Sequence, residues 1–159
     1  MATPNNNSFF PNGNQICVLT VAKEGVELPH YASSHAAGSD VRAFIEQDIV
    51  IEPGATALIP TGLQFAIPDG YEIQVRPRSG LAFKSGISIL NSPGTIDADF
   101  RGELKLLLIN HGKETFIVTP GMRCAQLILA PVMRANFSIV NELPSSVRGE
   151  GGFGHTGVN

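Results

Sequence analysis

One stretch near the middle of the chain carries side chains whose types and spacing suit work on a phosphate group. Arg78 stands directly before Ser79 and Gly80, at the head of a short helix-compatible run that Gly86 can end. Ser79 is a typical N-cap residue, and the free N–H groups of a helix start, with an arginine beside them, suit a bound phosphate. Asp97 follows in the same stretch. A carboxylate held close to a phosphate cradle predicts attack by water on a phosphoryl group.

The residues between the cradle and this carboxylate predict a β-hairpin. Residues 87–90 form a β-compatible run, and residues 91–94 (Asn-Ser-Pro-Gly) have the composition of a turn. Ile96 would then lie on the returning strand, with Asp97 directly after it. On this interpretation the hairpin holds the carboxylate in place.

A second carboxylate, Asp40, follows Gly38 at the predicted start of another strand. Such a carboxylate can accept hydrogen bonds from metal-bound water, or it can hold a neighbouring arginine, and both interpretations stay open. Arg123 and Gln126 stand on a further predicted strand, where the pattern by itself indicates a solvated face. The histidines and cysteines lack the spacing of zinc ligands, so a protein-held zinc site is not expected.

The stretch from Arg148 to Gly157 holds five glycines. The entropy cost of ordering so many glycines predicts a segment without regular structure. Arg148 can donate two parallel hydrogen bonds to a phosphate, and Phe153 can stack on a base. The segment is therefore either a flexible tail or an arm that becomes ordered only when a ligand binds.

The elements that must position these groups are short strands. Short β-rich runs alternate with Gly/Pro turns, helical periodicity is almost absent, and the chain has 17 Gly and 11 Pro. This pattern predicts an all-β sandwich or barrel. The expected strands cover residues 16–22, 49–51, 55–59, 63–67, 71–75, 87–90, 104–109, 116–118, 123–129 and 137–140.

Length and composition limit the classes of protein that fit. With 159 residues, 43% hydrophobic, the chain predicts one domain, and it has no apolar run long enough for a membrane span. A net charge of −3 indicates no stable binding of nucleic acid. Cys17 and Cys124 read as buried free thiols, which, with no signal peptide evident, suggests a cytoplasmic protein. We expect a disordered leader (residues 1–14), a β-domain (15–143) and a flexible Gly-rich arm (144–159) that closes over the active site.

Five short segments occur in an order that resembles the five motifs of the homotrimeric dUTPases. The resemblance implies a jelly-roll-like β-barrel that forms a homotrimer with active sites shared between subunits. It also implies hydrolysis of dUTP to dUMP and pyrophosphate, with Mg²⁺ carried by the triphosphate. The segments are residues 36–43, 78–81, 94–102, 120–127 and 148–157.

The resemblance gives each candidate residue near the phosphates a role. Asp97 would be the general base that deprotonates the attacking water. Asp40 would act through water on the Mg²⁺ shell, and Thr156 would lie near the γ-phosphate. The remaining groups would hold the phosphates: Arg78, Ser79, Gly80, Gln126 and Arg148.

The resemblance also implies how the nucleoside is bound. The hairpin around Asn91, with Gly94 and Thr95, would bind uracil and exclude the methyl group of thymine. Phe100 would lie under the deoxyribose. Phe153 would close over the base, and Gly154 beside it would also contact the substrate.

Three positions depart from the family pattern, and two other functions stay open. Phe100 stands where the family usually has tyrosine, Ser85 where histidine is common, and His155 where serine is common. The same fold serves dCTP deaminases, which need a glutamate base instead of the Asp97 motif. A catalytically weak nucleotide sensor that binds a regulatory partner is the other alternative.

Overall fold

The computed structural model of the chain describes residues 15–152, and within them twelve strands and one short helix form. The strands agree with most of the expected runs, and residues 49–51 and 116–118 match to the residue. The elements are β1 (Leu19–Ala22), β2 (His30–Tyr31), β3 (Ser39–Arg42), β4 (Ile49–Ile51), β5 (Thr56–Pro60), β6 (Leu63–Ala66), β7 (Tyr71–Pro77), α1 (Ser79–Ser85), β8 (Ile87–Ile89), β9 (Gly94–Ile96), β10 (Lys105–Asn110), β11 (Phe116–Val118) and β12 (Arg123–Pro131).

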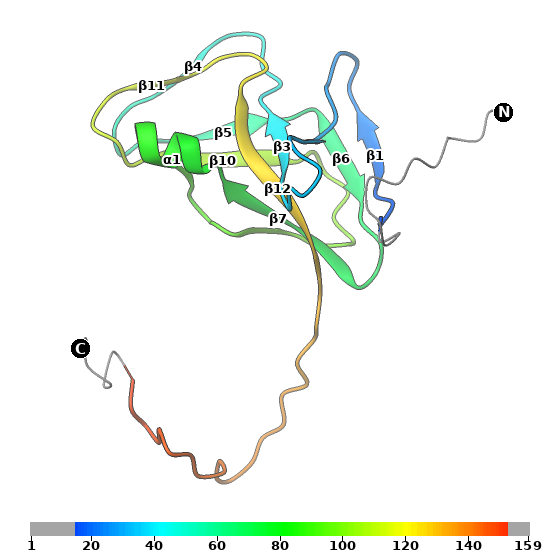
Figure 1. Cartoon of the computed structure of the whole chain (residues 1–159), viewed down its shortest axis with the longest axis vertical. Coiled ribbons are helices and arrows are strands. Elements are labelled where there is room, and N and C mark those ends of the chain that lie inside the picture. The colour runs from blue at the N-terminus through cyan, green and yellow to red at the C-terminus, as the bar shows by residue number, and fades with distance from the viewer. Residues whose placement is uncertain (1–14, 153–159) are drawn as a thin grey trace, which may run out of the picture.

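The strands form four antiparallel sheets that wrap around one core (Figure 1). The sheets have the strand orders β2-β3-β12-β7-β9, β5-β10-β8, β1-β6 and β11-β4. The predicted all-β class is confirmed. Gaps between the sheets remain, so hydrogen bonding does not close the barrel into one continuous ladder. No helix in residues 15–152 is long and apolar enough to cross a membrane.

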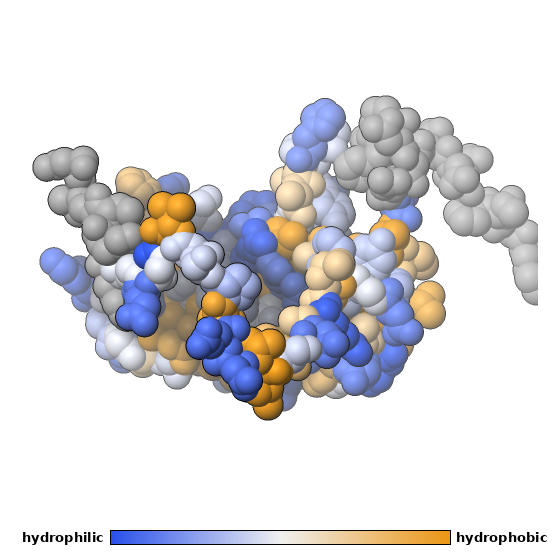
Figure 2. All heavy atoms as spheres, turned by 90° about the horizontal axis from the view of Figure 1, so that it is seen from below, coloured by the Kyte–Doolittle hydropathy of each residue, from blue (hydrophilic) through white to orange (hydrophobic). Residues whose placement is uncertain are grey.

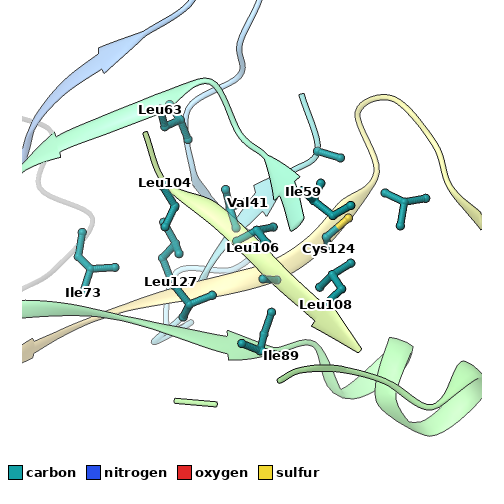
Figure 3. Packing of buried hydrophobic residues seen from close by; sticks show 14 of the residues in the cluster. Val41, Ile59, Leu63, Ile73, Ile89, Leu104, Leu106, Leu108, Cys124 and Leu127 are labelled. Carbon is teal, nitrogen blue, oxygen red and sulfur yellow. The ribbon is translucent and has the colours of Figure 1, made fainter. Parts of the chain in front are cut away.

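The core lies between the sheets and contains residues from one face of each sheet (Figure 3). On β10, Leu106 and Leu108 are fully buried, whereas Leu107 between them is only partly buried and Lys105 before them is exposed. This alternation is the period-2 pattern of a strand with one face on the core. Val41 of β3 and Leu127 of β12 reach the same cluster from the five-stranded sheet. The inner faces of β3 and β12 are thereby fixed, so the charged residues of these strands, Asp40, Arg42 and Arg123, face outward.

The helix α1 begins at Ser79, one residue earlier than a Ser79 N-cap requires, so that prediction is wrong. Arg78 occupies the cap position with extended backbone (φ −88°, ψ 126°) and makes no side-chain cap hydrogen bond. Its backbone continues the direction of β7, and the turn into the helix starts only at Ser79. Gly86 ends the helix as expected, because its φ of 68° lies in the left-handed region.

The predicted hairpin around Asn91 is also wrong. Strand β8 pairs with β10, and β9 pairs with β7 in a different sheet. The Leu90 N–H continues the first ladder by donating to the Leu107 carbonyl at 2.9 Å. Residues 91–93 therefore carry the chain from one sheet to another. Strands β8 and β9 each pair with a strand more distant in the sequence and not with each other.

Two further predictions fail at the ends of the domain. Residues 137–140 form no strand but belong to an extended segment that leaves the domain after β12 (Figure 1). Phe137 and Ile139 are 93% and 102% exposed, because no strand of the described chain lies beside them. Cys17 is exposed and only Cys124 is buried, where burial raises the pKa of the thiol to about 11. On the face of the molecule seen in Figure 2, exposed hydrophobic residues lie beside hydrophilic ones.

Candidate anion-binding site

Three charged side chains meet on the outer face of the five-stranded sheet. Two belong to strands, and the third directly follows a strand. Asp40 of β3 lies between Arg78, which follows β7, and Arg123 of β12. Arg78 Nε donates to Asp40 Oδ1 at 2.9 Å, and Arg123 Nη1 donates to Asp40 Oδ2 at 2.9 Å. The Asp40 side chain is only 16% exposed. Of its two predicted roles, holding arginines is the one seen in the contacts.

Arg78 is held on three sides and still has donors left. Its Nη2 contacts Asp40 Oδ2 at 3.4 Å, and its Nη1 donates to the Arg123 carbonyl oxygen at 3.1 Å. A guanidinium has five N–H groups, so about two remain for an anion. The group is preoriented, because the fork against Asp40 fixes the plane of the guanidinium.

Gln126 fixes the turn that carries Ser79 and Gly80. Its Nε2 donates to the Pro77 carbonyl oxygen at 2.9 Å, two residues before Ser79. The contact depends on Gly38, because a Cβ at that position would overlap Gln126 Oε1. Ser79 and Gly80 themselves are exposed in the first turn of α1, where backbone N–H groups lack partners within the helix.

Asp97 does not lie close to this cluster within the chain, contrary to the prediction. Ile96 pairs with Ile73 near the start of β7, whereas Arg78 stands five positions after Ile73, beyond the other end of that strand. At about 3.3 Å per residue, the two ends are about 16 Å apart. Asp97 is exposed, so its carboxylate faces outward at a separate edge. Antiparallel pairing is the reason, because β9 runs away from Arg78.

The residues predicted to bind the nucleoside gather on the β9 side of the sheet. Gly94 is buried against Val75, and Asn91 and Thr95 are exposed near it. Phe100 follows a turn in which its N–H donates to the Asp97 carbonyl at 3.1 Å. The ring of Phe100 is 44% exposed. The predicted uracil and sugar contacts thus lie near Asp97 and apart from the arginine cluster.

The predicted arm residues are only partly described. Arg148 is exposed, and its Nε donates to the Gly151 carbonyl at 2.7 Å within its own turn. Phe153, Gly154 and Thr156 lie outside the described residues. The leader of residues 1–14 also lies outside them, so the predicted leader and arm stay predictions.

The donor set here does not form a metal cage. Residues 15–152 contain no group of three or more His, Cys, Asp or Glu side chains that could hold an ion. Asp40 accepts three hydrogen bonds from arginines, which leaves about one of the four lone-pair sites of a carboxylate. That site fits a water of a metal shell better than the metal itself.

Arg123 is the functional candidate that the sequence pattern missed. In a regular strand, residues three positions apart face opposite sides, so Arg123 and Gln126 share one face only if the strand is irregular between them. A register shift between Arg123 and Ala125 lets Cys124 and Ala125 both point into the core. The two polar residues then share the outer face. Two consecutive small apolar residues in an alternating run are the signal that could have indicated this bulge.

The chain is thus an all-β protein whose five-stranded sheet carries two arginines joined by Asp40 on its outer face. Residues 24–157 match the family model described as dUTPase. The deoxyuridine 5'-triphosphate nucleotidohydrolase of Chlamydia pneumoniae is 58% identical over 136 residues, which span 85% of this chain and 94% of that protein. The corresponding protein of Bdellovibrio bacteriovorus is 58% identical over 131 residues, 82% of this chain and 88% of its own length. The chain belongs to the dUTPase family.

Solved structures agree in fold. A variant of the Staphylococcus bacteriophage 80alpha dUTPase with dUpNHpp has a TM-score of 0.80 and 25% identity, covering 91% of this chain and all of that one. A variant of the phage phi11 dUTPase, described with a structural Mg(II) ion, has a TM-score of 0.70 at 23% identity over 80% of this chain and 98% of its own. The second likeness concerns the fold alone.

Gly38→Ala should weaken the anion site without straining the backbone, because the φ of Gly38 lies outside the left-handed region. The new Cβ displaces Gln126 from the Pro77 carbonyl. We expect affinity for inorganic triphosphate to fall about fivefold, the scale of one lost hydrogen bond. Isothermal titration calorimetry measures this, with the melting temperature as a check on folding.

Gln126→Ala is the matched variant for this experiment, because it removes the same hydrogen bond from the other side. The double variant should bind triphosphate no more weakly than either single variant. Losses that add would contradict a shared contact.

Proposed function

We propose that this protein hydrolyses dUTP to dUMP and pyrophosphate. The observation that carries the proposal is the arginine cluster, in which Asp40 holds Arg78 with about two N–H groups left for phosphate oxygens. Membership of the dUTPase family supports dUTP as the nucleotide. The predicted cytoplasmic location stays a prediction.

At the phosphate end, the residues of the cluster bind and orient the triphosphate. Arg78 and the backbone N–H groups of Ser79 and Gly80 hold phosphate oxygens, and Gln126 keeps their turn in place. Arg148 adds a donor from the arm. Mg²⁺ arrives as part of the substrate, on the triphosphate, where it neutralises charge on the phosphate oxygens. The remaining acceptor site of Asp40 suits a water of the Mg²⁺ shell.

Asp97 is the proposed base, and it serves a site whose cradle belongs to another chain. A general base must lie within about 3 Å of the proton that it takes, or one water away. The separation of about 16 Å along β7 is far larger, so the Asp97 and Arg78 of one chain do not act on the same phosphorus. This supports a homotrimer with active sites shared between subunits.

The loop of residues 91–94 and the start of β9 would read the base. Gly94 is buried against Val75, and a backbone that encloses uracil tightly here would exclude the methyl group of thymine. Phe100 offers its ring to the deoxyribose but lacks the hydroxyl that the family usually has there. Phe153, Gly154 and Thr156 of the arm would close over the bound nucleotide.

The proposed function is tested by pyrophosphate release from dUTP, dCTP, dTTP and UTP. We expect dUTP to have by far the highest kcat/KM. Equal kcat/KM for dUTP and dTTP would rule out a uracil pocket. Conversion of the cytosine of dCTP to uracil would instead indicate a deaminase, and binding without turnover a sensor.

Asp97→Asn should lower kcat for dUTP by ~10² or more while leaving affinity within about tenfold. The change removes the proton acceptor but keeps the size of the side chain, and ~10² is the usual scale for a lost acid–base group. Steady-state kinetics and dUpNHpp binding measure the two effects. Asp99→Asn is the matched control, since Asp99 is an exposed carboxylate two positions away. A near-normal kcat in the Asp97 variant would reject the assignment.

Sharing between subunits predicts rescue between two inactive variants. Asp97→Asn lacks the base, and a truncation after Val147 lacks Arg148 and the rest of the arm. Co-refolding should restore activity, because an intact Asp97 from one chain can meet an intact arm from the other. The measurement is dUTP hydrolysis against mixing ratio, with size-exclusion chromatography to confirm mixed oligomers. If base and arm act from one chain, activity stays at the level of the parents at every ratio.

A further inference from the structure

We propose that Arg123 is a positioning residue for the triphosphate site, acting through Asp40 on Arg78. The proposal rests on the proposed function and deepens it, because it assigns a residue to the same site. Arg123 holds Arg78 in two ways. Its guanidinium fixes Asp40 Oδ2 at 2.9 Å, and its own carbonyl oxygen accepts from Arg78 Nη1 at 3.1 Å.

The first contact matters because a carboxylate that binds Arg78 alone can still turn about its own axis. Arg78 reaches Asp40 Oδ1 at 2.9 Å but Oδ2 only at 3.4 Å, so the fork between them is uneven. Arg123 holds Oδ2 from the other side and so fixes the plane of the carboxylate. The orientation of that plane sets where the unused N–H groups of Arg78 point.

Exposure within the trio places Asp40 at its most covered point. The side chains of Asp40 and Arg78 are 16% and 27% exposed, and that of Arg123 is 46% exposed. A lone surface ion pair at that exposure would contribute little. Here the pair belongs to a network with a half-buried centre, so loss of Arg123 leaves Asp40 and Arg78 free to rearrange.

The bulge in β12 places this support where it is needed. Because Cys124 and Ala125 both point into the core, Arg123 and Gln126 lie on one face. Arg123 holds Arg78, and Gln126 holds the Pro77 carbonyl one residue earlier. One irregular strand thus supports both sides of the turn that enters α1.

The chain offers a matched control in Arg42. It stands opposite Arg123 in the β3–β12 register and, like Arg123, forms an ion pair on the outer face. Its partners are Glu27 Oε2, at 3.0 Å, and the Gly121 carbonyl oxygen, at 2.8 Å, and not Asp40. Arg42→Gln removes the same charge from the same sheet without touching the network around Arg78.

The test is a double-mutant cycle on binding of dUpNHpp, measured by calorimetry, with KM and kcat for dUTP alongside. Arg123→Gln should weaken binding about tenfold, mainly through KM, and Arg42→Gln by less than about twofold. In an Arg78→Lys background, Arg123→Gln should lower the affinity for dUpNHpp by less than about a further twofold, because the fork that Arg123 supports is already gone.

Conservative replacement separates the two arginines. Arg123 gives Asp40 a single N–H bond, so Arg123→Lys should recover most of the lost affinity. Arg78 gives a fork, which an ammonium does not reproduce, so Arg78→Lys should not bind like the wild type. A stabilising role in the fold alone would lower the melting temperature without this pattern in KM.

Two results would overturn the proposal. Losses from Arg123→Gln and Arg78→Lys that add fully would make Arg123 an independent phosphate contact. An Arg123→Gln affinity equal to that of Arg42→Gln would leave Arg123 no role in the site. Either result differs from failure of the proposed function. That failure would appear as absence of dUpNHpp binding by the wild-type chain, and it would remove the basis of both proposals.

Discussion

The site depends on the position of β12 between β3 and β7. Antiparallel pairing on both sides brings Asp40, Gln126 and Arg76 level with one another, although they are far apart in sequence. The inner faces of the same strands are anchored by Val41, Val75 and Leu127 in the core. Because each strand is held by its buried face, its outer polar groups have fixed relative positions, and a charged cluster can form without a cofactor to organise it.

This fixed geometry explains how three charges can gather on a slightly acidic protein. Two arginines near each other repel, and each loses solvation as it is partly covered. Asp40 between them offsets this, since both its oxygens accept hydrogen bonds from arginines. The cluster has one positive charge more than negative, and this excess is what the proposed binding of a phosphate would neutralise.

The antiparallel register of β7 and β9 has the opposite consequence for catalysis. It places the proposed base beyond one end of β7 and the phosphate-binding arginine beyond the other. A single chain with this topology keeps the two groups apart however its loops move, because the ladder between them is rigid. After β12, Phe137 and Ile139 are also exposed, and no strand among residues 15–152 pairs with their segment.

Local patterns in the chain are enough to predict most of the strands and most of the candidate residues. Residues 49–51 and 116–118 could be predicted because period-2 alternation and Gly/Pro turns are local signals. Gly86 ended the helix for the same reason, since its φ of 68° is a local demand. The five motif segments likewise identified the family, because they are runs of residues and need no pairing to be read.

Only the tertiary structure decided which of these groups meet. Adjacent runs at residues 87–90 and 94–96 pair with β10 and β7 and not with each other, because strand pairing is decided by burial and register across the whole chain. The same long-range pairing joined Asp40 to two arginines, shifted Arg123 onto the face of Gln126 through a bulge, and separated Asp97 from Arg78. Residue types are written in the sequence, but distances between them follow from contacts between segments far apart along the chain.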